Sequence, residues 1–413
     1  MAENKINFTS MKENNTKLVL DRIRFSGHVS RKELAVQTGL TTATITNIVN
    51  DLLQKKFVKE IGSKPDCNAR DPEAQGERPV HKSGRKPIEL SVNEKAGYVV
   101  GIELLAGRLT CILTDFSGKI ISRSLKEFSL LETGDEIMEK AVLLVEELLA
   151  QAESMPGHLL GIGIGTVGPI DLENEVILNP PNVPGLYHYP VRKLLSERFH
   201  VPVVHEHHTA AAAYCEKWFG EATHSKCMVM CCVENVGIGS HILINGHFFH
   251  GFHGFSGEIG HVIIDRNGPK CSCGNYGCLE PLADTRALIN KVRKHFKTDP
   301  DLCRRCGIEN ADAIDLNFLV SHEDVDEVRF EILKCAQYLA SALCNFVMAV
   351  SPDTIVLAGD LPDRSPLYAG EVERIIHGRV YPLHSKEIKV YNSAFKENIG
   401  ALGAAALALD LVF

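Results

Sequence analysis

One histidine and three cysteines in the second half of the chain are spaced as metal ligands. They are His261, Cys271, Cys273 and Cys278, in the stretches GEIGH and CSCGNYGCLE. Three thiolates and one imidazole form a tetrahedral set that zinc takes in structural sites. The loop has too few apolar residues to order itself, so metal binding would supply folding free energy. We therefore expect a structural Zn²⁺ ion here; the alternative is three unrelated cysteines in a turn.

Two carboxylates beside this cluster could hydrogen-bond a ligand that carries several hydroxyl groups. Glu258 lies three residues before His261, hence on the same side of a helical turn, and Glu280 follows the last cysteine. A metal ion on one nitrogen of His261 would fix its tautomer and leave the other nitrogen for the ligand. We expect Glu258, His261 and Glu280 to line a sugar pocket.

A different group of polar residues lies near the N-terminus, between two predicted helices. Ser30 and Glu33 form a capping box for RKELAVQTG, and Thr41 or Thr42 begins TATITNIVNDLLQKKF. A short helix, a turn containing glycine and a second helix are typical of a helix-turn-helix, whose second helix reads base edges in the major groove. The alternative is any small three-helix bundle. The candidate DNA contacts are Ser30, Arg31, Thr41, Thr42, Ala43, Thr44, Thr46, Asn47 and Arg85.

The segments that follow these helices predict a wing. Residues 57–61 and 87–90 alternate apolar and polar side chains as strands do. Residues 63–84 between them are polar and without periodicity, which favours a long flexible wing tip. Arg85 at its end could reach a phosphate or the minor groove; a solvated basic turn is the alternative.

Charge and composition agree with a DNA-binding module on an acidic body. Residues 1–90 carry 16 Lys and Arg against 11 Asp and Glu, whereas the 413-residue chain carries 44 against 52. No apolar run reaches the roughly 18 residues of a membrane helix, and the first residues have no apolar signal core. We therefore expect a cytoplasmic protein with no membrane partner and with reduced cysteines.

The remainder of the chain alternates strands and helices. Three strands, a long helix and a buried strand are predicted over residues 98–171, and the same order recurs over residues 227–360. Two copies of one unit imply an α/β fold with two lobes and a cleft between them. The expected domains are a winged helix-turn-helix over 1–90, a small lobe over 91–204 plus 395–413, and a large lobe with the zinc loop over 205–394.

The stretch GHFFHGFHGFSGEIGHVIIDRNGPKCSCGNYGCLE resembles the signature of the ROK family of repressors, open reading frames and sugar kinases. LLGIGIGTVGPID, NPPNVPG and TIVLAGD fall where that family has matching segments, so the likeness covers nearly the whole chain. The resemblance implies a two-lobed actin-like, ribonuclease-H-like ATPase fold with a sugar site between the lobes. It adds Asn182, His207 and His208 to the expected sugar contacts. Members with an N-terminal winged helix are usually repressors of sugar-catabolism genes.

The residues that phosphoryl transfer requires depart from the family pattern. The family's kinases carry Asp-x-Gly-Gly-Thr at the first turn, where this chain has ELLAG over 103–107. Leu105 places a bulky side chain where backbone should meet phosphate, and Asp360 places a negative charge near the expected nucleotide. His208 stands where the kinases have the catalytic Asp, and His207 stands where they have an Asn. We therefore expect no kinase activity.

These patterns together predict a sugar-responsive transcription regulator, a repressor by the family resemblance. Its partners would be a double-stranded DNA operator, a sugar or sugar phosphate, and further copies of itself in a homodimer or homotetramer. Two alternatives stay open: an ATP-dependent sugar kinase that carries a DNA-binding domain, and a regulator controlled by a protein partner instead of a sugar.

Overall fold

The N-terminal domain contains three helices and a small three-stranded sheet. The computed structural model describes residues 8–62 and 87–412, so Arg85 and the predicted wing tip lie outside the described residues. The helices are α1 (Phe8–Ser26), α2 (Arg31–Thr38) and α3 (Thr42–Gln54). The strands β1 (Val29–Ser30), β2 (Val58–Ile61) and β3 (Glu89–Val92) pair in the order β1-β3-β2. Helix–turn–helix followed by the β2–β3 hairpin is the order expected of a winged helix.

Local signals explain the limits of α2 and α3. Ser30 and Glu33 form the predicted capping box, and Gly39 ends α2 in the left-handed conformation at φ 70°. The Thr41 side chain accepts a hydrogen bond from the backbone N–H of Thr44 and so caps α3. The buried stripe of α3 packs in one core with Val19, Leu20 and Ile23 of α1.

The first lobe is built on a five-stranded mixed sheet with the order β10-β7-β4-β5-β6. Strands β4, β5 and β6 are antiparallel, and β7 and β10 join β4 in parallel. Helices α4 (Gly134–Gln151) and α5 (Val191–Phe199) connect the parallel strands. The strand bounds are β4 (Tyr98–Leu105), β5 (Arg108–Asp115), β6 (Ile120–Glu127), β7 (Leu159–Thr166) and β10 (Val203–His207).

The second lobe repeats this arrangement. Its sheet has the order β13-β12-β11-β14-β15, again three antiparallel strands followed by two parallel ones. Helices α11 (Asp326–Val350) and α12 (Pro366–Arg379) precede and follow β14. The recurrence predicted from the sequence is therefore confirmed, down to strand order. The strand bounds are β11 (Met228–Val233), β12 (Ile238–Ile244), β13 (His247–Phe249), β14 (Thr354–Ala358) and β15 (Lys389–Asn392).

The strand limits correct two of the predicted boundaries. The limits placed after residues 90 and 204 fall inside β3 and β10, respectively. Hydrogen bonding overrides the sequence signal there, because β3 completes the wing and all five residues of β10 pair with β7. The rest of the division of the body into lobes stays a prediction.

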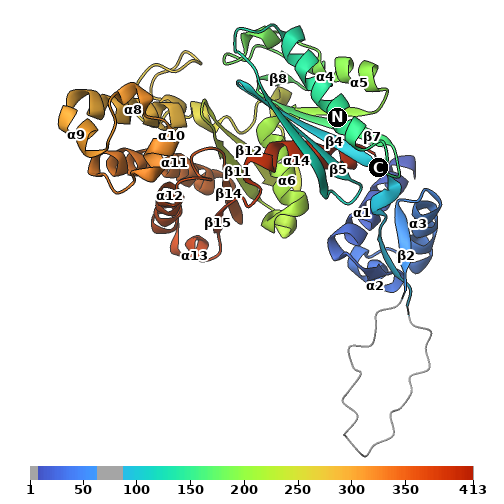
Figure 1. Ribbon diagram of the computed structural model, residues 1–413. Helices are drawn as coiled ribbons and strands as arrows, with labels where there is room; N and C mark the ends of the chain where they lie inside the picture. Colours follow the sequence, from blue (N-terminus) through green and yellow to red (C-terminus); the bar gives the residue numbers. More distant parts are fainter. Residues whose placement is uncertain (1–7, 63–86, 413) are drawn as a thin grey trace, which may run out of the picture.

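Helices α6 (His208–Phe219) and α14 (Ile399–Leu411) lie side by side between the two sheets (Figure 1). They approach so closely that a Cβ on Gly403 of α14 would lie 1.7 Å from the backbone oxygen of Ala211 in α6. A Cβ on Gly163 of β7 would likewise lie 1.8 Å from the oxygen of Ala404. Backbones packed at this distance leave little freedom for the helices to shift separately.

The N-terminal domain packs against the ends of these two helices. The Arg24 guanidinium of α1 lies 3.9 Å from the centroid of the Trp218 ring at the end of α6. Lys17 of α1 pairs with Asp410 of α14 at 2.5 Å, and Phe57 stacks on Phe116. The N-terminal domain is therefore joined to the body through packed side chains as well as through the chain itself.

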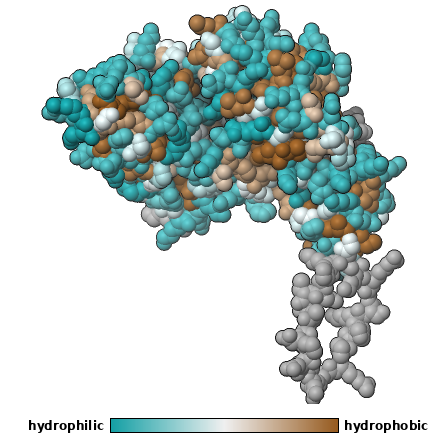
Figure 2. Space-filling model, in the orientation of Figure 1, coloured by the Kyte–Doolittle hydropathy of each residue, from teal (hydrophilic) through white to brown (hydrophobic). Residues whose placement is uncertain are grey.

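Helix α11 lies in the core of the second lobe. In the described part of the chain it is the one helix long and apolar enough to cross a membrane. It packs against α8 (Thr285–Thr298) and α12, and its inner residues belong to the largest buried cluster. On the face shown in Figure 2, hydrophobic side chains form separate patches on a mainly hydrophilic surface.

Candidate metal centre and ligand pocket

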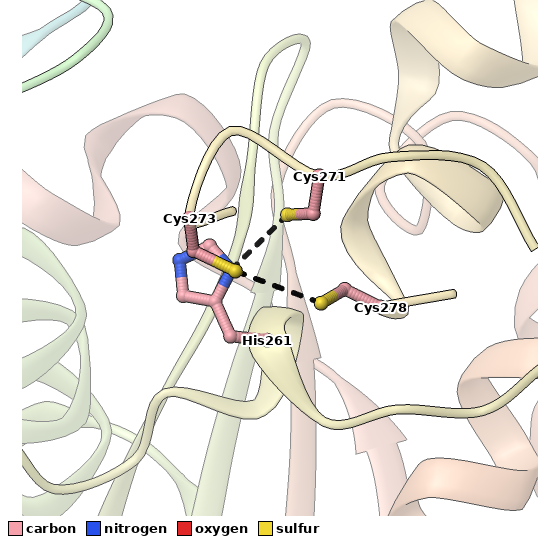
Figure 3. A group of neighbouring side chains, drawn as sticks. All are labelled: His261, Cys271, Cys273 and Cys278. Atoms are coloured by element: carbon pink, nitrogen blue, oxygen red, sulfur yellow. Dashed lines mark hydrogen bonds between the residues drawn. The ribbon is translucent and has the colours of Figure 1, made fainter. Parts of the chain in front are cut away.

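The four predicted metal ligands converge at one point beside the second sheet (Figure 3). Their donor atoms all lie within 4.8 Å of one another. Sγ of Cys271 is 3.5 Å from Nδ1 of His261, and the sulfurs of Cys273 and Cys278 are 3.7 Å apart. Zn–S bonds of about 2.3 Å in a tetrahedron place two sulfurs roughly 3.7 Å apart. The donor set and its spacing therefore fit a tetrahedral metal ion.

The loop around this cluster is shaped by backbone contacts. Two isolated bridges, Ile263 to Cys278 and Lys270 to Tyr276, bring its arms together. Gly277 has φ 72°, and a Cβ there would lie 1.5 Å from the backbone oxygen of Asp265. Only glycine fits this position. The conformation of the loop, and with it the placement of the four predicted metal ligands, therefore depends on Gly277.

All six residues predicted to bind a sugar line one cavity of about 370 Å³ next to the cluster. Its walls come from loops at the carboxyl ends of β7 and β10, the β11–β12 turn and the metal loop, where α/β folds place ligands. The residues are Asn182, His207, His208, Glu258, His261 and Glu280.

His261 joins the metal cluster to the pocket. Its Nδ1 faces the sulfur of Cys271, and its Nε2 lies 4.0 Å from Oε2 of Glu258. Glu280 begins α7 (Glu280–Ala283) and accepts a hydrogen bond from Ser272 of the loop at 3.4 Å. The loop therefore positions three of the six residues of the pocket.

His207 and His208 are neutral imidazoles. Burial lowers the pKa of His207 to about 4, and burial also places the pKa of His208 well below its usual value. Nδ1 of His207 lies 2.7 Å from Oγ1 of Thr209 and accepts a hydrogen bond from its backbone N–H, so His207 caps α6. Neutral imidazoles offer one donor and one acceptor each, which suits hydroxyl groups better than charged ligands.

His205 does not belong to the pocket or to a second metal group. It lies in β10, and its Nε2 is 2.8 Å from Oγ1 of Thr166 in the buried interior. Among the described residues, the His261 cluster is the one group of three or more such side chains with converging donor atoms. The histidines at 205, 207 and 208 therefore form no second group of this kind in the part of the chain that the structure describes.

A group of carboxyl residues lies at the carboxyl ends of β4, β11 and β14, where the family resemblance predicts the phosphate half of the cleft. Glu103 lies two residues before the end of β4 and is 5% exposed, and burial raises its pKa to about 7. Burial raises the pKa of Asp363 to about 7 and that of Glu234 well above its usual value. Asp360 accepts a hydrogen bond from the backbone N–H of Asn235 at 2.8 Å, so this amide is already occupied.

One arginine faces these acids. Nη1 of Arg108 lies 4.0 Å from Oδ1 of Asp360, and Glu103 and Glu234 also attract its charge. Leu105 is buried beside this turn. The charge of Arg108, which a phosphate would need for its neutralisation, is therefore already paired with Asp360.

The predicted DNA contacts differ in how free their side chains are. Thr42, Ala43 and Asn47 are exposed on the first turns of α3. Thr41 and Thr44 bond to each other at 2.9 Å, and Thr46 donates to the backbone oxygen of Thr42.

Two further candidates lie at the start of α2. Ser30 is buried and bonded to Glu33, and Arg31 pairs with Glu60 of the wing at 2.9 Å. The exposed group on α3 is therefore the best placed for base edges.

Comparison with known proteins gives one family and two kinds of relative. The model of the ROK family matches residues 99–411. The xylose repressor of Bacillus spizizenii is 31% identical over 404 residues, which cover 97% of this chain and 96% of that protein. The glucokinase of Thermotoga maritima is 26% identical over 315 residues, which cover 75% of this chain and 96% of the glucokinase.

The solved structures divide in the same way. A ROK family transcriptional regulator described as a homologue of the E. coli MLC protein has a TM-score of 0.78 at 22% identity and covers 97% of both chains. A ROK family glucokinase from Streptomyces griseus, solved with glucose and AMPPNP, has a TM-score of 0.66 at 21% identity. It covers 75% of this chain and 99% of its own. Both likenesses show the fold.

Proposed function

Because this chain belongs to the ROK family, we propose that it is a sugar-responsive transcriptional repressor of carbohydrate-metabolism genes that does not phosphorylate its sugar. One observation carries the proposal. Six polar residues converge on a pocket at the start of α6, and the end of the same helix contacts the DNA-binding domain. Binding at one end of a rigid element can therefore bias the position of the domain at the other.

The effector that we propose is an aldopyranose of the size of D-xylose. Full-length relatives at 31% and 30% identity are named xylose repressors. Imidazoles occupy the two positions where family kinases have Asn and Asp, and they are bulkier than either side chain. Their neutral state at physiological pH favours a neutral sugar over a sugar phosphate.

We propose that the metal in the cluster is zinc. His261, Cys271, Cys273 and Cys278 would hold it, since three sulfurs and one nitrogen suit zinc better than a hard cation. Bound zinc would supply structural stabilisation and no catalysis, because all four positions of the tetrahedron are protein ligands. The chain's own contribution is to aim Nε2 of His261 at the pocket, next to Glu258.

The kinase alternative is disfavoured by charge and by space. Phosphoryl transfer needs positioned phosphates and neutralisation of their charge. The corresponding half of this cleft presents Glu103, Glu234, Asp360 and Asp363 against Arg108. His208 could accept a proton, but no phosphate would lie near it.

Helix α6 would carry the signal between the two functions. His207 caps its first turn within the pocket, and Thr209 ties that turn to the backbone oxygen of Ser240 in β12. The helix has 12 residues, about 18 Å in length, and ends at Trp218 against Arg24. A sugar that pulls the two lobes together would move this end and, with it, α1.

DNA release then follows from geometry. A dimer reads two half-sites about 34 Å apart, so a small rotation of each helix-turn-helix breaks their register. The homodimer or homotetramer that this requires stays a prediction. A protein partner that regulates DNA binding would act through the same contact between Arg24 of α1 and Trp218 of α6.

The test is fluorescence anisotropy of the full-length protein on a duplex from its own upstream region, at two salt concentrations and with D-xylose or D-glucose. We expect affinity to fall steeply with salt, and one sugar to weaken binding by about ten-fold or more. Asn47→Ala should weaken binding by about ten-fold, whereas Gln54→Ala, an exposed residue at the other end of α3, should change it less than about two-fold. Absent or salt-independent binding would contradict the proposal.

Two further measurements separate the alternatives. Protein with ATP, Mg²⁺ and the same sugars should form no sugar phosphate; turnover at ordinary enzyme rates would favour the kinase. Trp218→Leu should leave DNA affinity within a few-fold but abolish release by sugar, and Trp218→Phe, which keeps an aromatic face for Arg24, should restore it. Equal release in both variants would exclude α6 as the route.

A further inference from the structure

A small buried chamber lies against the sugar pocket, and neither the sequence patterns nor the family resemblance assigns it a role. Its volume is about 20 Å³, enough for one water-sized group. Pro169, His207, Phe255 and Glu258 line both the chamber and the pocket. The titratable residues that line the chamber alone are Glu206 of β10, His241 of β12 and His250, and the hydroxyl residues Thr209 and Ser256 line it as well.

The histidines of the chamber have nitrogen atoms without hydrogen-bond partners. His241 is 5% exposed, and its buried Nε2 has no partner among the described residues; the same holds for the buried Nδ1 of His250. Nε2 of His250 lies 3.5 Å from Oε1 of Glu206. Buried polar atoms left unpaired are destabilising, so a group that bonds to them would bind favourably.

The chemistry of these walls selects the occupant. Burial lowers the pKa of His241 to about 3 and also lowers that of His250, which favours the neutral form of both imidazoles. Donor atoms here do not converge as in the cysteine cluster, which argues against a metal ion. A hydroxyl group is small and neutral, and it both donates and accepts, so it suits a carboxyl oxygen and an imidazole nitrogen together.

We propose that Glu206, His241 and His250 form a selectivity subsite that receives one hydroxyl group of the bound sugar. The subsite deepens the proposed sugar sensing and rests on it. The three residues would act by rejecting sugars that lack this hydroxyl, because such sugars leave the buried nitrogens unpaired. His207 and Glu258, which face both spaces, would bind the neighbouring hydroxyls.

The experiment combines chain variants with deoxy sugars. Calorimetry of the full-length protein is performed with D-xylose, D-glucose and their monodeoxy analogues. For the wild type we expect removal of one particular hydroxyl to weaken binding by about ten-fold or more. In His241→Leu the parent sugar should bind about ten-fold more weakly, and the same deoxy analogue should bind about as well as the parent.

Two variants control this experiment. His253→Leu changes an exposed histidine of the same stretch that lines neither space, and it should keep the wild-type ratio. Glu206→Gln keeps the shape of the chamber, and it should change the ratio of parent to analogue even if His241→Leu proves unstable.

The outcomes are distinguishable. A wild type that binds none of these sugars would overturn the sugar sensing and the subsite together. Normal sugar binding with the same parent-to-analogue ratios in the wild type, His241→Leu and Glu206→Gln would overturn the subsite alone. A crystal structure with bound sugar and a water molecule between His241 and His250 would also overturn it.

Discussion

The two halves of the cleft have the same fold around them and opposite chemistry within them. In the sugar half, burial lowers the pKa of His207 to about 4, so the walls are neutral and can exchange hydrogen bonds with hydroxyls. The other half contains the carboxyl residues at the ends of β4, β11 and β14 and is called the phosphate half after the family resemblance. There, burial raises the pKa of Glu103 and Asp363 to about 7. The same physical cause, desolvation, favours the neutral form in both halves: the imidazoles lose a proton and the carboxyls keep one. The halves differ in what they offer a ligand, because the imidazoles suit hydroxyl groups, whereas Asp360 already occupies Arg108 and the backbone N–H of Asn235.

This contrast shows that a binding pocket and a catalytic apparatus can be separated on one scaffold. Both halves lie at the ends of strands of the same two sheets, so their difference arises from side chains and not from topology. Family members of both kinds, named repressors and named glucokinases, agree with such a separation.

The largest effect is expected from breaking the metal loop that builds one wall of the sugar half. Cys278→Ser removes a buried ligand and should reduce sugar affinity by about a hundred-fold or more, because the loop that positions Glu258, His261 and Glu280 loses its order. Metal content and calorimetry measure the two effects. Cys344→Ser, a half-buried cysteine of α11 outside the cluster, should change neither. Full sugar affinity without metal would contradict the structural role of the loop.

A smaller loss should follow from a single contact in the same half. Glu258→Gln keeps the size of the side chain and replaces its charge, so we expect sugar affinity to fall by about ten- to a hundred-fold. DNA affinity without sugar should stay within about two-fold, since Glu258 lies far along the chain from the DNA-binding domain and lines the pocket. Equal losses for sugar and DNA would instead indicate a general folding defect.

The phosphate half should respond to pH through Glu103. Its pKa is about 7 in the folded chain, above the ordinary value of 4.5, so its contribution to stability is present below about pH 4.5 and is lost as pH rises through 7. Glu103→Gln cannot ionise. Its stability relative to the wild type should therefore increase on the order of 1 to 3 kcal/mol between about pH 5 and pH 8.

Thermal unfolding over this pH range measures the difference in stability between Glu103→Gln and the wild type. In the sugar half, His207 should show the opposite pH dependence. His207 has a pKa of about 4, below the ordinary 6.5, so its contribution is present above about pH 6.5 and is lost as pH falls through 4. The stability of His207→Gln relative to the wild type should accordingly increase as pH falls. Parallel curves for both variants and the wild type would contradict the contrast between the halves.

Much of the molecule could be predicted from the sequence because the signals are local. The capping box at Ser30, the glycine that ends α2 and the four ligands of the metal cluster all lie within short stretches. The repeated strand order followed from two copies of one pattern. Asn182, His207 and Glu280 lie far apart in sequence, and only the family resemblance indicated that they meet.

The residues that were missed carry no local signal. Glu234, Asp363, His241 and His250 are ordinary polar residues in or after strands, and tertiary folding brings each to the cleft. The Arg24–Trp218 contact joins α1 to α6 across nearly two hundred residues. Such pairs could have been suspected only from an arginine and a tryptophan placed within otherwise apolar stripes of two helices.

The smallest effect is expected from the substitution that restores the catalytic residue of the family's kinases. His208→Asp restores the residue type that the family's kinases have at the catalytic position, yet we expect no sugar phosphate above the wild-type background with ATP and Mg²⁺. A base accelerates transfer only when the phosphate is already positioned. Leu105 still fills the place for it, and Asp360 still occupies the backbone N–H of Asn235. Nuclear magnetic resonance of phosphorus over a long incubation provides the necessary sensitivity. Formation of sugar phosphate by this single variant would show that the phosphate half still binds nucleotide. The loss of kinase activity would then rest on His208 alone and not on the side chains of the phosphate half.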